Sequence, residues 1–178
     1  AVERIAREAG DAIMTIYARD FTVEQKADNS PLTEADQAAH HVIARGLKAL
    51  PLQLPILSEE DAESFSGMDA QGRYWLVDPL DGTKEFIKRN GEFTVNIALV
   101  EGGVPTRGVV YAPAKARMFF TQADGQSVEE SGAFDKGQVG ETKAISVSNP
   151  DNAALMVVAS KSHRDQATDD YIGKYAVR

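Results

Sequence analysis

The stretch WLVDPLDGTKEF, residues 75–86, places three apolar residues directly before two aspartates that stand three positions apart. The apolar residues predict a buried strand, and Asp78, Pro79, Asp81 and Gly82 are residue types that favour a tight turn after it. A turn of this kind needs no functional explanation. The alternative is a metal site that holds a phosphate, and the remaining sequence has to decide between the two.

The composition narrows the class of protein. The 178 residues suffice for one domain, or for one domain and part of another, and a hydrophobic fraction of 43% allows a large core. A net charge of −8 argues against a nucleic-acid partner, which would demand a basic face. No apolar run approaches the roughly 20 residues that span a bilayer, and the start of the chain does not have the pattern of a signal peptide. The chain has no cysteine, which excludes thiolate metal sites and thiol catalysis. We expect a cytoplasmic location, with peripheral attachment to the inner face of the membrane as an option.

Periodicity predicts helices followed by strands. Apolar spacing predicts a helix over residues 2–18, and Thr33 with Asp36 three positions later resembles the cap of a second helix. Expected strands and the last helix follow in this order: strands over 54–61, 73–77, 92–100, 106–113, 116–122, 144–148 and 155–160, and a helix over 163–175. This order predicts a layered α+β fold. A boundary near Pro150 would divide a metal- and phosphate-binding domain, residues 1–150, from the beginning of a substrate domain, residues 151–178.

The residues around the two aspartates suit Mg²⁺. This ion prefers oxygen ligands, and one or two carboxylates plus substrate phosphate suffice to hold it. Asp78 and Asp81 on a turn can point at one spot, and the Leu80 carbonyl is free to join them. Glu59 or Glu60, at the end of a neighbouring strand, would complete the set. Residues 82–87 are expected to open a helix, whose free N–H groups would make a phosphate site.

These residues also carry a resemblance. VDPLDGT, residues 77–83, resembles the first signature of the lithium-sensitive, Mg²⁺-dependent phosphatase superfamily that includes the inositol monophosphatases. KADNSPLTEAD and LSEED are similar to that family's N-terminal loop and glutamate-bearing strand end. The stretch 81–113, together with SKSH at 160–163, is similar to one branch, the bacterial CysQ-type 3′(2′),5′-bisphosphate nucleotidases. The resemblance implies the family's layered α-β-α-β-α sandwich of the sugar-phosphatase type, here truncated at its C-terminal end.

The resemblance also implies roles at the site, with two or three Mg²⁺ ions. Glu59, Asp78 and the Leu80 carbonyl would hold one ion, and Asp78 would bridge to a second ion bound by Asp81. Thr83, paired with Asp36, would orient and deprotonate a metal-activated water, with Glu59 nearby. The residues expected to contact substrate are Glu59, Leu80, Asp81, Gly82, Thr83, Lys84, Ser160 and His163.

Bland explanations stay open for the lesser residues. Asp36 could serve only as a helix cap, and Lys84 could be an ordinary surface lysine. Glu60 could be a solvated carboxylate, and we rank it second to Glu59 as a metal ligand. A lone His163 would more often be structural or exposed, although its place in SKSH favours a function. His40 and His41 are expected to have no function.

One departure from the family concerns its last metal-binding aspartate, which comes from a Trp-Asp motif in the C-terminal part. The only tryptophan here is Trp75. We therefore expect the chain to be a fragment of a longer enzyme, with that aspartate beyond Arg178.

The resulting expectation is a Mg²⁺-dependent phosphomonoesterase that converts adenosine 3′,5′-bisphosphate to AMP and phosphate. The substrate partner is thus a small phosphorylated nucleotide, and a homodimer is left as an option. Two alternatives stay open: an inositol or sugar phosphate phosphatase of the same superfamily, and an inactive metal- or phosphate-binding module.

Overall fold

The computed structural model of the chain describes residues 1–25, 31–132, 140–160 and 164–177. These residues belong to two compact units, Ala1–Ile145 and Ser146–Arg178. The predicted division of function near Pro150 stays a prediction. In the described part of the chain, no helix combines the length and the apolar character needed to cross a membrane.

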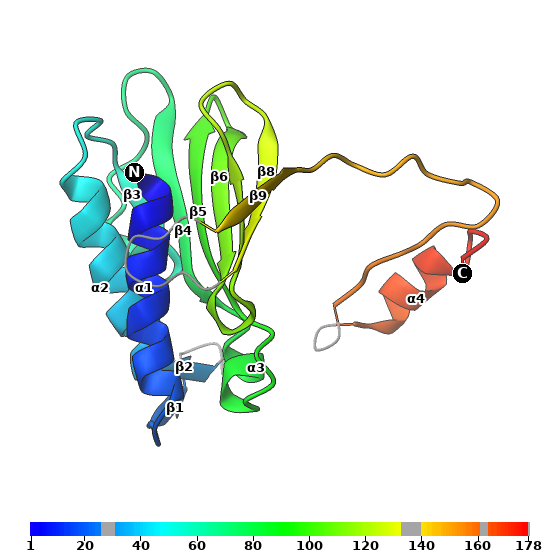
Figure 1. The fold of residues 1–178 in the computed structure, drawn as a ribbon, viewed down its shortest axis with the longest axis horizontal. Coiled ribbons are helices and arrows are strands. Elements are labelled where there is room, and N and C mark those ends of the chain that lie inside the picture. The colour runs from blue at the N-terminus through cyan, green and yellow to red at the C-terminus, as the bar shows by residue number, and fades with distance from the viewer. Residues whose placement is uncertain (26–30, 133–139, 161–163, 178) are drawn as a thin grey trace. The chain divides into compact units, whose positions relative to one another are not determined.

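Two helices cover one face of a seven-stranded sheet in the first unit (Figure 1). The helices are α1, Val2–Tyr17, and α2, Glu34–Lys48. The strands of the sheet lie side by side in chain order: β3 (Ile56–Ser58), β4 (Arg73–Asp81), β5 (Thr94–Glu101), β6 (Val104–Ala112), β7 (Arg117–Thr121), β8 (Ser127–Ser131) and β9 (Glu141–Ala144). β3 and β4 run parallel, and the other neighbours run antiparallel. Helices layered on a mixed sheet confirm the predicted fold class.

The smaller elements connect this framework. β1 (Val23–Gln25) and β2 (Pro31–Thr33) form a separate antiparallel pair. Two 3₁₀ segments, η1 (Glu59–Ser64) and η2 (Pro113–Lys115), and the short helix α3 (Thr83–Ile87) complete the first unit's described elements. In the second unit, α4 spans Gln166–Ile172, within the helix predicted over 163–175.

Both predicted N-terminal helices are confirmed, and their sequences explain why they form. In α1, Ile5, Ala9 and Ile13 recur at helical spacing and are fully buried against the sheet. At the start of α2, Thr33 and Asp36 form a reciprocal capping box. The amphipathic faces of the two helices therefore supply one wall of a single core.

Two strand predictions differ from the structure, and one strand was not predicted. The strand predicted over 144–148 is wrong, because β9 ends at Ala144. The strand predicted over 155–160 is also wrong: in the described part of the second unit this apolar run forms only one bridge, from Leu155 to Val177. A strand needs a partner, and the run has none here beyond that bridge. The sequence pattern missed β8, since one of its buried positions is Glu130, which pairs with Arg7 at 2.6 Å.

β4 corrects the predicted turn at Asp78 and Asp81. The strand does not end before them but continues through Asp81 with an irregular register. Opposite it, Asn96 pairs with Asp78 and Thr94 pairs with Asp81. β4 therefore takes three steps where β5 takes two, which is a β-bulge with one extra residue. Residues three apart on a regular strand face opposite sides, so this bulge is what allows the two aspartates to share a face.

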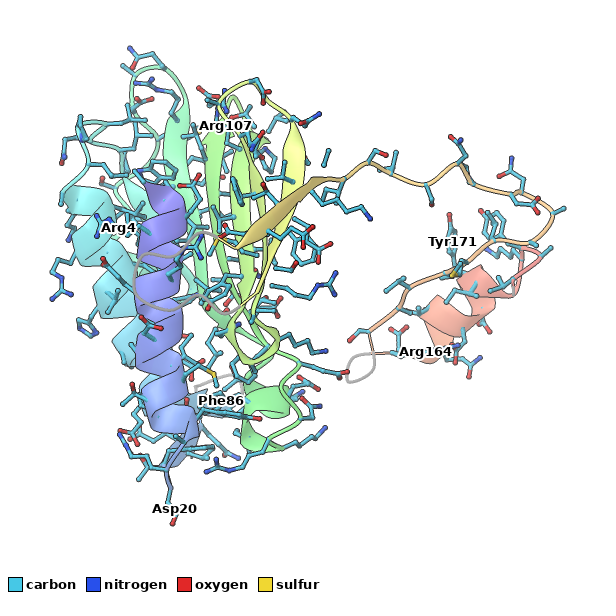
Figure 2. All side chains as sticks on the ribbon, in the orientation of Figure 1. Arg4, Asp20, Phe86, Arg107, Arg164 and Tyr171 are labelled. Atoms are coloured by element: carbon cyan, nitrogen blue, oxygen red, sulfur yellow. The ribbon has the colours of Figure 1, made fainter. Side chains whose placement is uncertain are left out.

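Aromatic packing holds α3 against the end of α1. The Phe86 ring centroid lies 5.2 Å from Tyr17, 4.8 Å from Phe21 and 5.2 Å from Phe93 (Figure 2). The Arg89 guanidinium donates to the carbonyl of Tyr17, the last residue of α1, and to the carbonyl of Arg19 just after it. These contacts fix the helix that starts at Thr83, immediately after the two aspartates.

Gly82 joins the bulged strand to α3 in a conformation that suits only glycine. Its φ is 93°, and an added Cβ would lie 2.8 Å from the Glu92 carbonyl oxygen. Gly67 has nearly the same φ, 97°, but an added Cβ there would meet nothing within 4 Å. The two positions therefore share the backbone strain and differ in the close approach.

We predict that Gly82→Ala lowers the free energy of unfolding more than Gly67→Ala does. Both variants place an L-residue in the left-handed region, which costs about 1–2 kcal/mol. Only Gly82→Ala also pushes its new Cβ against the Glu92 carbonyl oxygen. Chemical denaturation of the two variants measures the difference, expected at about 1 kcal/mol or more. Equal losses would show that the approach to Glu92 is unimportant.

Candidate active site

Asp78 has a carboxylate neighbour on either side where β3 and β4 reach the same edge: it contacts Glu59, and the charge of Asp81 acts on it. Ser58 at the end of β3 pairs with Val77, so Glu59 arrives level with Asp78 across a parallel pair. The Glu59 side chain shares a hydrogen bond with Asp78, and the charge of Asp81 acts on Asp78 as well. The predicted metal-binding side chains are thus neighbours, although they come from two strands.

The electrostatics of this cluster are unfavourable without a cation. Burial, followed by the nearby charges of Glu59 and Asp81, raises the pKa of Asp78 to about 7. The hydrogen bond with Glu59 acts in the same direction, and the Leu80 backbone opposes it. Like charges that crowd each other in a partly buried site are relieved either by a proton or by a metal ion.

The residues present fit Mg²⁺. Asp78 Oδ1 is buried and, among the described residues, has no hydrogen-bond partner. Within residues 1–25, 31–132, 140–160 and 164–177, no three His, Asp or Glu side chains form a group that could hold a metal ion by themselves. Mg²⁺ needs only one or two carboxylates, with carbonyl, water or phosphate oxygens as the other ligands. The pairs Glu59–Asp78 and Asp78–Asp81, together with the Leu80 carbonyl, match that requirement.

Asp36 serves the helix cap and the candidate site together. The side chain is buried, 1% exposed. Its Oδ2 accepts from the backbone N–H of Thr33 at 2.8 Å and from the Thr33 hydroxyl at 2.6 Å. Its Oδ1 accepts from the Thr83 hydroxyl at 3.0 Å. From the sequence, a capping role and a functional role for Asp36 were alternatives. In the structure they are compatible, because Oδ2 makes the cap and Oδ1 contacts Thr83.

The Thr83 hydroxyl is oriented by its neighbours. Besides Asp36, the Leu80 carbonyl lies within hydrogen-bond distance, at 3.2 Å. Because the single hydroxyl hydrogen is directed to these acceptors, the oxygen retains a lone pair that can accept a proton from outside. Burial raises the pKa of Asp36, and its hydrogen bonds with Thr33 and Thr83 act in the opposite direction. Thr83 and Asp36 can therefore pass a proton between them.

The other predicted residues are distributed as follows. Gly82 and Thr83 begin α3, and Lys84 follows half-buried on its first turn. Glu60 is held by Gln37, whose amide nitrogen lies 3.4 Å from it, while Glu59 contacts Asp78. Ser160 belongs to the second unit, and His163 lies outside the described residues.

Sequence reasoning gave no role to two polar residues on β5. The Asn96 side-chain amide donates to Asp81 at 3.2 Å, and the Thr94 hydroxyl donates to Asn96 at 2.9 Å. Thr94 and Asn96 stand two positions apart in the strand predicted over 92–100 and so share a face, but only the pairing of β5 with β4 brings that face to the aspartates. The sequence thus shows that two polar side chains share one face of the strand, but it does not show which residues they contact.

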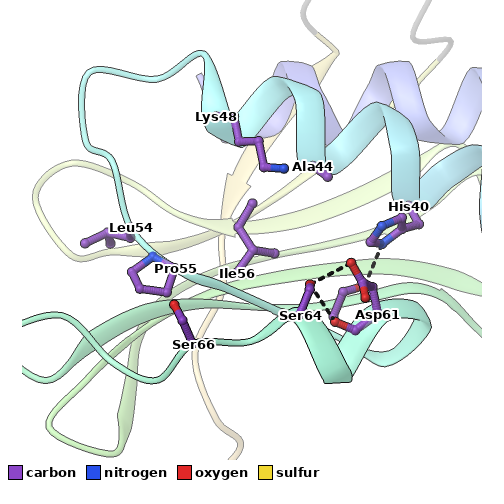
Figure 3. Close-up of a pocket in the computed structure, with 10 residues that line it drawn as sticks. His40, Ala44, Lys48, Leu54, Pro55, Ile56, Asp61, Ser64 and Ser66 are labelled. Carbon is purple, nitrogen blue, oxygen red and sulfur yellow. Dashed lines mark hydrogen bonds between the residues drawn. The ribbon is translucent and has the colours of Figure 1, made fainter.

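A cavity of about 260 Å³ lies beside β3, between α2 and η1. Figure 3 shows His40 and Lys48 on the helix side and Asp61 and Ser64 on the opposite side. His40 Nδ1 lies 2.9 Å from the hydroxyl of Ser58, the residue before Glu59. His40, expected to have no function, therefore contacts the segment that presents Glu59.

Comparison with known proteins gives one family. The sequence pattern of the inositol monophosphatase family matches residues 1–177. The chain is 49% identical over 171 residues to the 3′(2′),5′-bisphosphate nucleotidase CysQ of Escherichia coli O157:H7, covering 95% of this chain and 65% of the relative. The chain thus spans slightly less than two thirds of that relative's length.

Solved structures agree with this fold. The crystal structure of CysQ from Bacteroides thetaiotaomicron, described as a bacterial member of the inositol monophosphatase family, superposes with a TM-score of 0.71 at 36% identity, over 98% of this chain and 68% of that one. An inositol monophosphatase and NADP phosphatase solved with Mg²⁺ and phosphate gives a TM-score of 0.57 at 19% identity, over 68% of this chain and 46% of that one. At that identity the second similarity concerns the fold alone.

We predict that Asp78→Asn stabilises the metal-free protein at about pH 8 and has little effect near pH 4. The pKa of Asp78 is raised from 3.8 to about 7, so ionising it as the pH rises between these values costs stability, and the full cost is present above about pH 7. Thermal unfolding in a chelator measures the effect; each 1 kcal/mol shifts Tm by roughly 2–4 °C at this chain length.

The matched control is Asp20→Asn, which removes an exposed carboxylate at the far end of α1 (Figure 2). The difference in Tm between the Asp78→Asn and Asp20→Asn variants should grow as the pH rises from acid to neutral. Identical pH profiles for both would contradict the crowding of charges around Asp78.

Proposed function

This chain belongs to the inositol monophosphatase family, and from that membership we propose that it carries the catalytic residues of a Mg²⁺-dependent phosphomonoesterase acting on adenosine 3′,5′-bisphosphate. The products would be AMP and phosphate. The observation that carries the proposal is the junction of two features: a crowded carboxylate cluster on β3 and β4, and a buried Asp36–Thr83 pair beside it. Neither feature alone would suggest hydrolysis of a phosphate ester.

We assign the metal ligands from the chain's own oxygens. Glu59, Asp78 and the Leu80 carbonyl would hold one Mg²⁺, and Asp78 with Asp81 would hold a second. Mg²⁺ bound there would lower the pKa of a water and stabilise the charge on the leaving oxygen. Two observations support this assignment: the pKa of Asp78 is raised, and its buried Oδ1 has no hydrogen-bond partner in the part of the chain that the structure describes. A third ion stays a prediction.

The protein's part in the reaction is proton transfer and positioning. Thr83 Oγ1 accepts a proton from the attacking water, and the Thr83 hydroxyl proton moves to Asp36 Oδ1, 3.0 Å away. The water oxygen bonds to phosphorus, the P–O bond to the ribose oxygen breaks with its electrons going to that oxygen, and the leaving oxygen takes up a proton from solvent to give the hydroxyl of AMP. The Gly82 and Thr83 amides would hold the phosphate, and Lys84 would add a positive charge next to them.

The substrate assignment rests on the surroundings of the metals. A metal site recognises only a phosphate on a leaving oxygen, so selectivity must come from other residues. Relatives named bisphosphate nucleotidases share nearly all of this sequence range. Lys84, after the DGT stretch, offers a positive charge for a second phosphate. Roles for Ser160 and His163 in substrate binding stay predictions from the resemblance of SKSH. An inositol or sugar phosphate phosphatase is the second candidate; a homodimer and a cytoplasmic location stay predictions.

Substrate comparison tests the function. With Mg²⁺, the protein as the cell makes it should release phosphate from adenosine 3′,5′-bisphosphate with a higher kcat/KM than from inositol 1-phosphate. His163→Ala should narrow the gap by about one to two powers of ten, which is the cost expected for losing the hydrogen bond to a charged phosphate that we assign to His163. Equal kcat/KM values in the wild type would favour the inositol branch, and no release from either substrate would favour a binding module.

A double-mutant cycle tests the proton path. Thr83→Ala and Asp36→Asn should each lower kcat by roughly 100-fold or more, with a smaller effect on KM. Together they should cost little more than either alone, since the two residues act as a unit. Thermal unfolding of all three variants checks that they are folded. Additive losses in kcat would separate the residues and return Asp36 to a capping role only.

A further inference from the structure

Asp81 is held by a neighbour that comes from β5. The Nδ2 atom of Asn96 donates to Asp81 Oδ2 at 3.2 Å. The Thr94 hydroxyl donates to Asn96 Oδ1 at 2.9 Å. Thr94 and Asn96 are two residues apart on one strand, so they share a face, and their pairing partners across β4 are the two aspartates.

Elementary hydrogen-bond chemistry fixes the orientation of this chain of contacts. An ionised carboxylate only accepts, so the NH₂ group of Asn96 must face Asp81. The carbonyl oxygen of Asn96 then faces Thr94, whose hydroxyl is a donor. Thr94 therefore prevents the Asn96 amide from turning over, and one oxygen of Asp81 is occupied by an N–H group.

We propose that Asn96, anchored by Thr94, determines metal specificity by keeping Asp81 a one-oxygen ligand and so favours Mg²⁺ over Ca²⁺. Mg²⁺ requires near-octahedral coordination at short distance and takes one oxygen from each carboxylate. Ca²⁺ takes six to eight ligands and gains from carboxylates that offer both oxygens. Because the Asn96 N–H takes one lone pair of Oδ2, a metal ion that binds both oxygens of Asp81 has to compete with this hydrogen bond, whereas an ion bound through Oδ1 alone does not, which favours the smaller ion.

This inference rests on the proposed metal site but not on the reaction. It concerns a residue that positions a ligand, so its readout is the ratio of two metal affinities. A merely structural role for Asn96 would weaken both ions or neither. Binding is measured in the absence of substrate, which separates a failure of this inference from a failure of the proposed phosphatase activity.

The experiment uses the full-length protein after its metal ions have been removed with a chelator. Calorimetric titration with Mg²⁺ alone or Ca²⁺ alone gives the affinity for each ion. In Asn96→Ala, the Ca²⁺ to Mg²⁺ affinity ratio should rise by about threefold or more, which is below the roughly 10–100-fold effects typical of residues that orient metal ligands, because this contact is exposed. Thr94→Val should shift the ratio in the same direction by less, since the amide remains but loses its anchor.

Thr106→Val is the matched control. Its hydroxyl donates to Glu101, so it loses a hydroxyl-to-carboxylate hydrogen bond on the same sheet without touching Asp81. Its affinity ratio should equal that of the wild type. If Asn96→Ala does not fold, Thr94→Val decides. An unchanged ratio in the folded Asn96 and Thr94 variants, or an equal weakening of both ions, would overturn the proposal.

Discussion

The extra residue in β4 between Asp78 and Asp81 is the constraint on which the candidate site depends. On a regular strand these aspartates would face opposite sides of the sheet, one toward the helices and one away. The bulge turns both toward one face, opposite Asn96 and Thr94, and leaves Leu80 buried with 2% of its surface exposed. The Leu80 side chain thus anchors the bulge in the core while the neighbouring carboxylates crowd together outside it.

The candidate site also depends on Asp36, which caps α2 and contacts Thr83 at the same time. A carboxylate at 1% exposure is costly unless its oxygens are satisfied, and here three donors from Thr33 and Thr83 satisfy them. Two of those donors belong to the start of α2 and one to the start of α3. The same carboxylate therefore caps the start of α2 and ties the start of α3 to it, so that helix capping helps to set the geometry of the site.

The fold was largely readable where one face of an element is apolar. The spacing of Ile5, Ala9 and Ile13 predicted α1, and alternation over 92–100 predicted β5. Prediction failed where burial does not follow hydrophobicity. β8 hides a buried Glu130 whose charge is met by Arg7, 123 residues earlier in the chain, and no local pattern shows that pairing. The apolar run at 155–160 shows the reverse, because a strand sequence without neighbouring strands does not make a sheet.

By itself the sequence determined the residue types of the site: clustered Asp and Glu with a Gly-Thr step after them, whose chemistry suits Mg²⁺ and phosphate whatever their positions. It also determined α2 and its cap, since a capping box is a local interaction. The resemblance to a known family already favoured Glu59 over Glu60 and paired Asp36 with Thr83, but the contacts of Glu59 with Asp78 and of Asp36 with Thr83 form only in the tertiary structure. The contact of Asn96 with Asp81 was decided by the tertiary structure alone. Each of these contacts joins different elements, and strand register and helix packing, which set such distances, depend on the whole core and not on neighbouring residues.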